Sequence, residues 1–81
     1  MEIIRIDTII LSILYTKQAV DKVRGMTLNE MIEVEDLLKL SNLRIRTHKL
    51  CEAGYIQEGY KSANSKTYFI TNSGIKVLTC N

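Results

Sequence analysis

The stretch that decides the fold is residues 54–74, GYIQEGYKSANSKTYFITNSG. Aromatic and β-branched residues are concentrated in residues 55–60 and again in residues 66–70, as is typical of β-strands. Between these two runs, residues 61–65 are small or polar, which favours a turn. The stretch therefore predicts a β-hairpin with a polar tip.

A short helix is predicted directly after the hairpin. Thr71 is a favoured helix N-cap, because its hydroxyl can accept a hydrogen bond from a free backbone N–H. Beyond Gly74, the residues Ile75, Val77 and Leu78 supply apolar side chains. We expect these side chains to dock the helix on the core.

A longer helix is predicted immediately before the hairpin. Its expected N-cap is Ser41, and Gly54 is expected to end it. The inner face consists of residues at steps of three and four, namely Leu43, Thr47, Leu50 and Cys51. The other faces carry polar, basic or isolated apolar residues, namely Asn42, Arg44, Ile45, His48 and Lys49. This helix should therefore present a polar and basic outer surface, with the direction of Arg46 depending on the helix rotation.

Another helix is expected to begin after Thr27. Thr27 and Glu30 have the spacing of a capping box, in which each side chain bonds a backbone N–H of the other residue. The apolar residues from Val34 to Leu40 continue the pattern in a shifted phase. They allow either a long, bent helix or a separate short turn.

The N-terminal helix is predicted from its regular apolar spacing. Asp7 is a plausible N-cap, and apolar residues recur around and after it at positions 6, 9, 10, 13 and 14. The pattern fades through residues 22–24, and Gly25 is a natural C-terminal residue for a helix. A second apolar set, Leu11, Tyr15 and Ala19, lies on another side of the same helix.

This surplus of apolar side chains predicts a homodimer. The first set is sufficient to face the core, which leaves Ile3, Leu11 and Tyr15 without a partner in one chain. A second copy is the simplest cover for such a surface, through the first helix and the C-terminal helix. The alternative is that these residues pack under the hairpin or under the turn near Asp36.

Length and composition indicate one globular domain spanning residues 1–81. The chain has 46% hydrophobic and 25% charged residues, which is ordinary for a folded protein. Its longest apolar stretch, residues 9–15, is too short to span a membrane, and no secretory signal is visible. We expect a cytoplasmic protein in which the isolated Cys51 and Cys80 are reduced.

The predicted order is helix, helix, helix, strand, turn, strand, helix, an α+β and mostly helical winged helix-turn-helix. The residues agree with this order in Leu40-Ser41-Asn42-Leu43, in Leu50 followed by Gly54-Tyr55-Ile56, and in Tyr68-Phe69-Ile70-Thr71-Asn72-Ser73-Gly74. This pattern resembles small bacterial, plasmid and phage winged-helix proteins of the broad MarR and PadR kind. The resemblance covers residues 27–78 and implies DNA binding.

The charge distribution favours double-stranded DNA as the partner. Residues 27–40 hold four acidic residues against one lysine, whereas residues 41–66 hold five basic residues against two acidic ones. On the helix before the hairpin, Ser41, Asn42, Arg44, Ile45 and His48 are expected to reach base edges and Lys49 a phosphate. At the hairpin tip, Lys61, Ser62, Asn64 and Lys66 are expected to contact the backbone or the minor groove. The predicted protein is a transcriptional regulator or a plasmid or phage site-binding protein.

Enzyme chemistry is not expected. His48 stands in no nucleophile motif, and the glycines at positions 25, 54, 59 and 74 form no phosphate loop. The cysteines lack metal-ligand spacing, so we expect no metal, cofactor or dedicated small-molecule pocket. The alternative function is a winged-helix protein-interaction module, which should show an apolar or acidic patch in place of the basic surface.

Overall fold

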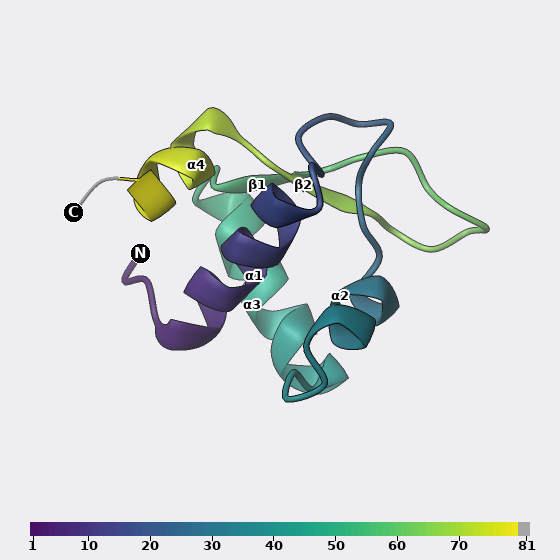
Figure 1. Cartoon of the computed structure of the whole chain (residues 1–81), viewed down its shortest axis with the longest axis horizontal. Helices are drawn as coiled ribbons and strands as arrows, with labels where there is room; N and C mark the ends of the chain where they lie inside the picture. Colours follow the sequence, from purple (N-terminus) through teal and green to yellow (C-terminus); the bar gives the residue numbers. More distant parts are fainter. Residues whose placement is uncertain (80–81) are drawn as a thin grey trace.

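The computed structural model describes residues 1–79 and contains the predicted α+β architecture. Within this range the elements are α1 (Arg5–Thr16), α2 (Leu28–Val34), α3 (Leu40–Glu52), β1 (Ile56–Glu58), β2 (Tyr68–Ile70) and α4 (Asn72–Thr79). Figure 1 shows the hairpin extending away from the helices, with α4 and the N-terminus at the opposite end of the molecule. The arrangement is that of a winged helix-turn-helix, as the sequence predicts.

The start of α1 differs from the prediction. The helix begins at Arg5 with Ile4 as its N-cap, and Asp7 is the third helical residue. The Asp7 carboxylate accepts a hydrogen bond from the Ile4 backbone N–H at 2.9 Å. Asp7 therefore satisfies a free N–H at this helix end, but it does so from inside the first turn.

The end of α1 lies well before Gly25, where the sequence placed it. Gln18 adopts a left-handed conformation with φ of 60°. The N–H of Ala19 bonds to the carbonyl of Leu14, and the N–H of Gln18 bonds to that of Tyr15. This is a Schellman motif, and its usual apolar contact is supplied by the buried pair Ala19 and Leu14. The prediction was wrong because a glutamine occupies the position that glycine usually takes.

The helix-turn-helix is formed by α2 and α3. Thr27 and Glu30 make the predicted capping box in both directions. The open question over residues 34–40 is resolved, because α2 ends at Val34 and a separate turn follows. In this turn the Leu38 N–H bonds to the carbonyl of Glu35, and the Leu38 side chain is buried. The buried Leu38 side chain thus anchors the turn to the core.

The start of α3 also differs from the prediction. Its N-cap is Lys39, whose side chain makes no capping bond, and Ser41 lies inside the first turn. The predicted end is confirmed, since Gly54 has φ of 83° and the Tyr55 N–H bonds to the carbonyl of Leu50. Glycine suits this conformation because it has no Cβ.

The hairpin pairs Ile56 with Ile70, Gln57 with Phe69 and Glu58 with Tyr68. Its regular strands are shorter than predicted. At the tip, Ser62 and Ser65 exchange two backbone hydrogen bonds, and Ala63 and Asn64 between them both have positive φ. These angles define a type I′ turn, which matches the twist of a hairpin.

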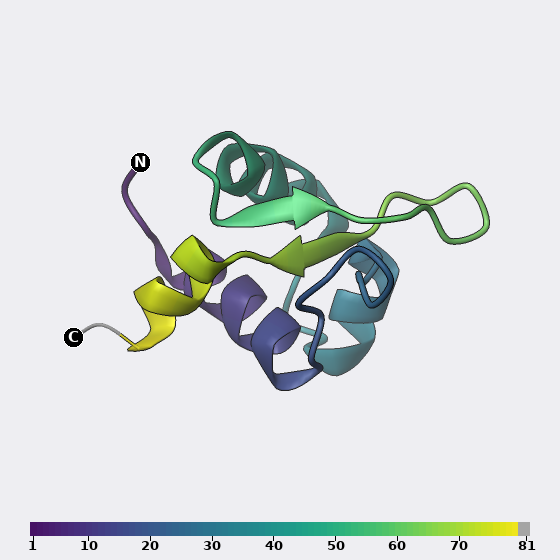
Figure 2. The ribbon, with the colours of Figure 1, turned by 90° about the horizontal axis from the view of Figure 1, so that it is seen from above.

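Residues 17–27 support the outer edge of β2. Met26 and Tyr68 exchange two backbone hydrogen bonds of 2.8 Å, and the Ile70 N–H bonds to the carbonyl of Ala19. Figure 2 shows this segment and α1 on one side of the hairpin and α3 on the other. The base of the hairpin is therefore held from both sides.

The predicted capping of α4 by Thr71 is confirmed, because its hydroxyl accepts the Gly74 N–H at 3.2 Å. The same hydroxyl donates to the carbonyl of Gly54 at 2.6 Å, which ties α4 to the end of α3. A Cβ on Gly74 would collide with the carbonyl oxygen of Tyr55 and would lie 2.7 Å from Ile70 Cγ1. Glycine lets α4 approach the hairpin closely.

The core joins α1 to the other elements and corrects one prediction. Leu11 is fully buried in the chain's own core, together with Ile10 and Leu14 of α1 and with Leu43 and Leu50 of α3. The apolar spacing predicts that only one face of α1 contacts the core, and Leu11 was therefore assigned to a dimer interface. In the structure, α1 contacts α2, α3, α4 and β2, so core residues surround more of the helix. Leu11 is not available to a partner.

No helix among residues 1–79 combines the length and the apolar character that crossing a membrane requires.

Candidate nucleic-acid interface

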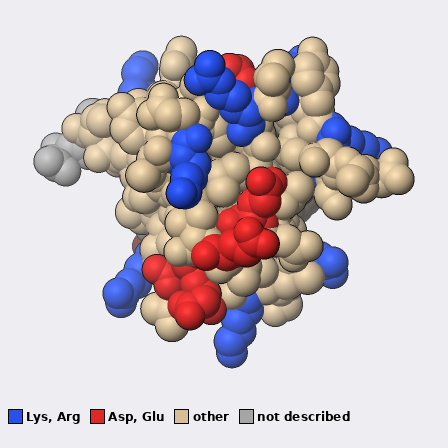
Figure 3. Space-filling view, turned by 45° about the vertical axis from the view of Figure 1, so that its right-hand side comes forward, with Lys and Arg blue, Asp and Glu red and all other residues tan. Residues whose placement is uncertain are grey.

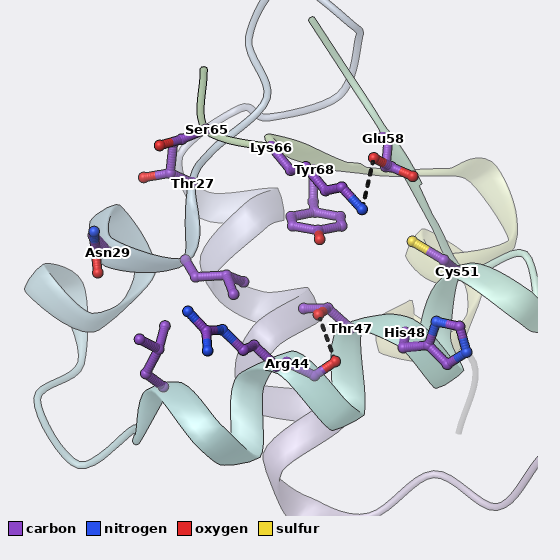
Figure 4. Close-up of a pocket in the computed structure, with 12 residues that line it drawn as sticks. Thr27, Asn29, Arg44, Thr47, His48, Cys51, Glu58, Ser65, Lys66 and Tyr68 are labelled. Atoms are coloured by element: carbon purple, nitrogen blue, oxygen red, sulfur yellow. Dashed lines mark hydrogen bonds and ion pairs between the residues drawn. The ribbon is translucent and has the colours of Figure 1, made fainter. Parts of the chain in front are cut away.

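A groove runs between α3, the start of α2 and the hairpin (Figure 4). Side chains from all three elements line it: Thr27, Leu28 and Asn29 from the start of α2, Leu40, Arg44, Thr47, His48 and Cys51 from α3, and Glu58, Ser65, Lys66 and Tyr68 from the hairpin. The groove thus brings together residues that are up to 41 positions apart in the sequence, from Thr27 to Tyr68. Of the predicted contact residues, Arg44, His48 and Lys66 meet here.

The outer face of α3 is exposed as predicted. Leu43, Thr47 and Leu50 point into the core, so the residues on the opposite side of the helix face outward. These outward residues are Ser41, Asn42, Arg44, Ile45, His48 and Lys49, and all six are exposed. Ile45 is 56% exposed, which leaves an apolar side chain free on an otherwise polar surface.

Thr47 shows how a polar residue is accommodated on the inner face. Its hydroxyl donates to the carbonyl of Leu43 at 2.6 Å, one turn earlier in the same helix. The hydroxyl is thereby satisfied within its own helix. Of the outward residues of α3, Arg44 and His48 line the groove on either side of this position.

Arg46 does not lie free on the surface but pairs with the buried Asp7. Arg46 Nε and Nη2 donate to the two carboxylate oxygens of Asp7 at 2.7 and 2.6 Å. The hydrogen bond to Asp7 raises the pKa of the Arg46 guanidinium, so the guanidinium stays charged. A bidentate pair of this kind fixes orientation as well as distance. It therefore sets the rotation of α3 relative to α1, and no local sequence pattern links residues 39 positions apart.

The hairpin tip carries the predicted polar and basic residues on its surface. Lys61, Ser62, Asn64 and Lys66 are all exposed. Lys66 alone among these four lines the groove, where its ammonium lies 3.9 Å from Glu58 Oε1 (Figure 4). Lys61, Ser62 and Asn64 lie beyond the groove, toward the tip.

Sequence reasoning missed several residues of the groove, above all Asn29, Glu58 and Tyr68. Asn29 is exposed at the start of α2, and Tyr68 forms the floor beneath Lys66. Burial is the main reason that the pKa of the Tyr68 phenol is raised. The capping box placed the start of α2 correctly, but the sequence holds no signal that this start faces the hairpin.

Acidic side chains cover the neighbouring surface. Glu30, Glu33 and Asp36 are exposed on α2 and on the turn after it. Figure 3 shows acidic atoms gathered in the lower centre of this face, with Lys and Arg around them. In residues 1–79 no group of three or more His, Cys, Asp or Glu residues could hold a metal ion.

Two further groups in or beside the groove have defined neighbours. His48 Nε2 lies 3.2 Å from Glu52 Oε1, one turn along the exposed face of α3. Burial raises the pKa of the Cys51 thiol from 9.0 to about 11, and the Glu58 carboxylate adds to this effect. The thiol is therefore protonated at neutral pH. Cys80 lies outside the described residues.

Cys51 is expected to react slowly with alkylating reagents. At pH 8 its thiolate fraction should be about a hundredfold below that of a thiol with the ordinary value, because each pKa unit is a factor of ten. Peptide mass spectrometry after timed iodoacetamide treatment measures the rate, with the urea-unfolded protein as the control. The same shift predicts that stability falls as pH rises from 9.0 to about 11, since the unfolded thiol ionises first. Equal alkylation rates in folded and unfolded protein would contradict the assignment.

A helix-turn-helix whose exposed second helix borders a β-hairpin defines a winged helix-turn-helix protein. The chain is 32% identical over 69 residues to the DNA-binding protein TubR of Clostridium botulinum C phage, a match that covers 85% of this chain and 84% of the relative. The chain belongs to the TubR family. No family model and no solved structure matches it. The finer resemblance to the MarR and PadR kind stays a prediction.

Proposed function

We propose that this protein binds double-stranded DNA, with α3 in the major groove and the hairpin on the backbone. The observation that carries the proposal is the exposed polar and basic face of α3 beside a hairpin with two exposed lysines. An α-helix fits the major groove, where each base pair presents a distinct set of donors and acceptors. The kinship with a protein named for DNA binding supports the same function.

The side chains divide into two roles. Asn42 and Arg44 are suited to adenine and guanine edges, and Ile45 to a thymine methyl, because their functional groups complement those bases. Lys49 and the hairpin residues Lys61 and Lys66 suit phosphates, which hold the protein on any sequence. The protein would act by occupying a DNA site. It would do so either to control transcription or to bind a plasmid or phage site.

The division of roles predicts different losses from two alanine variants. Arg44→Ala should weaken binding to the selected site by about 1–3 kcal/mol while leaving random duplex less affected. Lys61→Ala should weaken both duplexes alike and flatten the salt dependence, because one phosphate contact fewer releases fewer counterions. Fluorescence anisotropy at several salt concentrations, after selection of a site from random duplexes, measures both effects.

The control for this experiment is Glu33→Ala, which removes a charged side chain from the outer face of α2. Absence of any salt-dependent duplex binding by the unaltered protein would refute DNA binding and favour an interaction module. If Arg44→Ala weakened binding to both duplexes equally, α3 would not be the element that recognises the base sequence.

We further propose that the protein acts as a homodimer through α1 and α4. These helices contact each other and leave apolar side chains partly exposed, namely Ile6, Ile9, Ile75, Val77 and Leu78, and Ile3 just before α1 is also partly exposed. Tyr15 of α1 is 42% exposed. α4 and the start of α1 lie at the end opposite the hairpin tip (Figure 1), so that a partner there would leave both hairpins free.

The dimer predicts a change of mass in one variant. Val77→Glu should shift the sedimenting species from dimer to monomer at micromolar concentration and weaken DNA binding, because a charge is placed among the partly exposed apolar side chains of α4. Leu37→Glu is the matched control, since Leu37 is 81% exposed on the turn after α2. A monomer mass for the unaltered protein would refute the dimer.

A further inference from the structure

The groove contains an ion pair of its own, between Glu58 and Lys66. Glu58 pairs with Tyr68 across the hairpin, so Lys66, two residues before Tyr68, is its diagonal neighbour on the same face. Glu58 Oε1 and Lys66 Nζ are 3.9 Å apart, and the side chains are 55% and 63% exposed. Figure 4 shows the pair beside the ring of Tyr68 and directed into the groove.

The negative charge of Glu58 is unfavourable in a surface that binds a polyanion. Among the described residues that line the groove, it is the one carboxylate, and it stands with the cations Arg44 and Lys66. A carboxylate at this place competes with phosphate for the Lys66 ammonium. Lys66 has to leave Glu58 before it can neutralise a phosphate completely, and the release of counterions that drives backbone binding is reduced accordingly.

We propose that Glu58 is a positioning residue that holds Lys66 in the free protein and so limits affinity for the DNA backbone. This inference rests on the proposed DNA binding. The penalty applies to every duplex, whatever its sequence. A protein with a weaker hold on the backbone depends more on the base contacts of α3, and its binding to unrelated DNA is kept low.

The test is Glu58→Gln, which keeps the size of the side chain and removes its charge. Affinity for a random duplex should rise about two- to fivefold, the range expected for release of an exposed ion pair. The slope of log K against log salt should steepen by about 0.9, because one more phosphate is neutralised. A merely structural role of Glu58 would leave this slope unchanged.

Two comparisons separate this inference from simpler explanations. Glu33→Gln adds the same net charge on the exposed face of α2, outside the groove, and should change neither affinity nor slope appreciably. In a Lys66→Gln background, Glu58→Gln should give no gain. The same gain in that background, or an effect equal to that of Glu33→Gln, would overturn the inference while leaving DNA binding intact. Failure of the unaltered protein to bind any duplex would instead refute the proposed function.

Discussion

Asp7→Asn is expected to lower the free energy of unfolding by about 3 kcal/mol, the scale for breaking a buried ion pair on one side. Asp7 has no exposed surface, and its carboxylate accepts two hydrogen bonds from Arg46 and one from Ile4. An amide has the same shape but brings no charge and only one acceptor oxygen. A folded domain of this size has about 4–12 kcal/mol in total, so the loss is a large share.

Urea denaturation followed by circular dichroism, at one fixed protein concentration, measures this change. Asp36→Asn is the control, since Asp36 is exposed, and its effect should stay within about 0.5 kcal/mol. The double variant Asp7→Leu with Arg46→Met should recover most of the stability, because a buried pair can be replaced by apolar residues. If that stable variant binds DNA more weakly, the pair positions α3. An Asp7→Asn protein as stable as the unaltered one would contradict the ion-pair assignment.

Gly74→Ala is expected to destabilise the fold by about 2 kcal/mol, although alanine is the better helix former. Helix propensity alone favours alanine by about 1 kcal/mol. The added methyl group would collide with the Tyr55 carbonyl and Ile70, and overpacking of this kind costs up to about 3 kcal/mol. The collision is the larger effect because one of the two atoms belongs to the backbone and cannot rotate away.

The matched control is Ser73→Ala, one residue earlier and exposed on the same helix. It should be neutral or slightly stabilising, since only helix propensity changes. Urea denaturation of the two variants side by side decides the matter. A stabilised Gly74→Ala protein would show that α4 can shift away from the hairpin at little cost.

Local signals predicted those parts of the fold in which a residue forms hydrogen bonds with backbone groups of its near neighbours in the sequence. The capping box at Thr27, the cap at Thr71 and the helix end at Gly54 all bond backbone groups a few residues away. The end of α1 was missed because Gln18 adopts a left-handed backbone conformation, which a glutamine in the sequence does not indicate. Leu11 was misassigned because the number of elements packed around α1 is a property of the whole fold.

The candidate interface shows the same division. The outward residues of α3 followed from helical spacing, and their exposure agrees with the prediction. The partner of Arg46 and the meeting of Glu58 with α3 depend on contacts between distant segments. Local patterns in a single sequence do not indicate such contacts.

The double attachment of β2 has a consequence for the thermodynamics of DNA binding. On one side β2 pairs with β1, and on the other its Tyr68 and Ile70 are bonded to Met26 and Ala19. The base of the hairpin is therefore already ordered before any ligand arrives. Immobilisation entropy on binding should arise mainly in the long side chains near the tip, such as Lys61, and not in the backbone that carries them. The hairpin base is thus preorganised, and amide hydrogen exchange in β2 should be slow in the free protein and little changed in the complex.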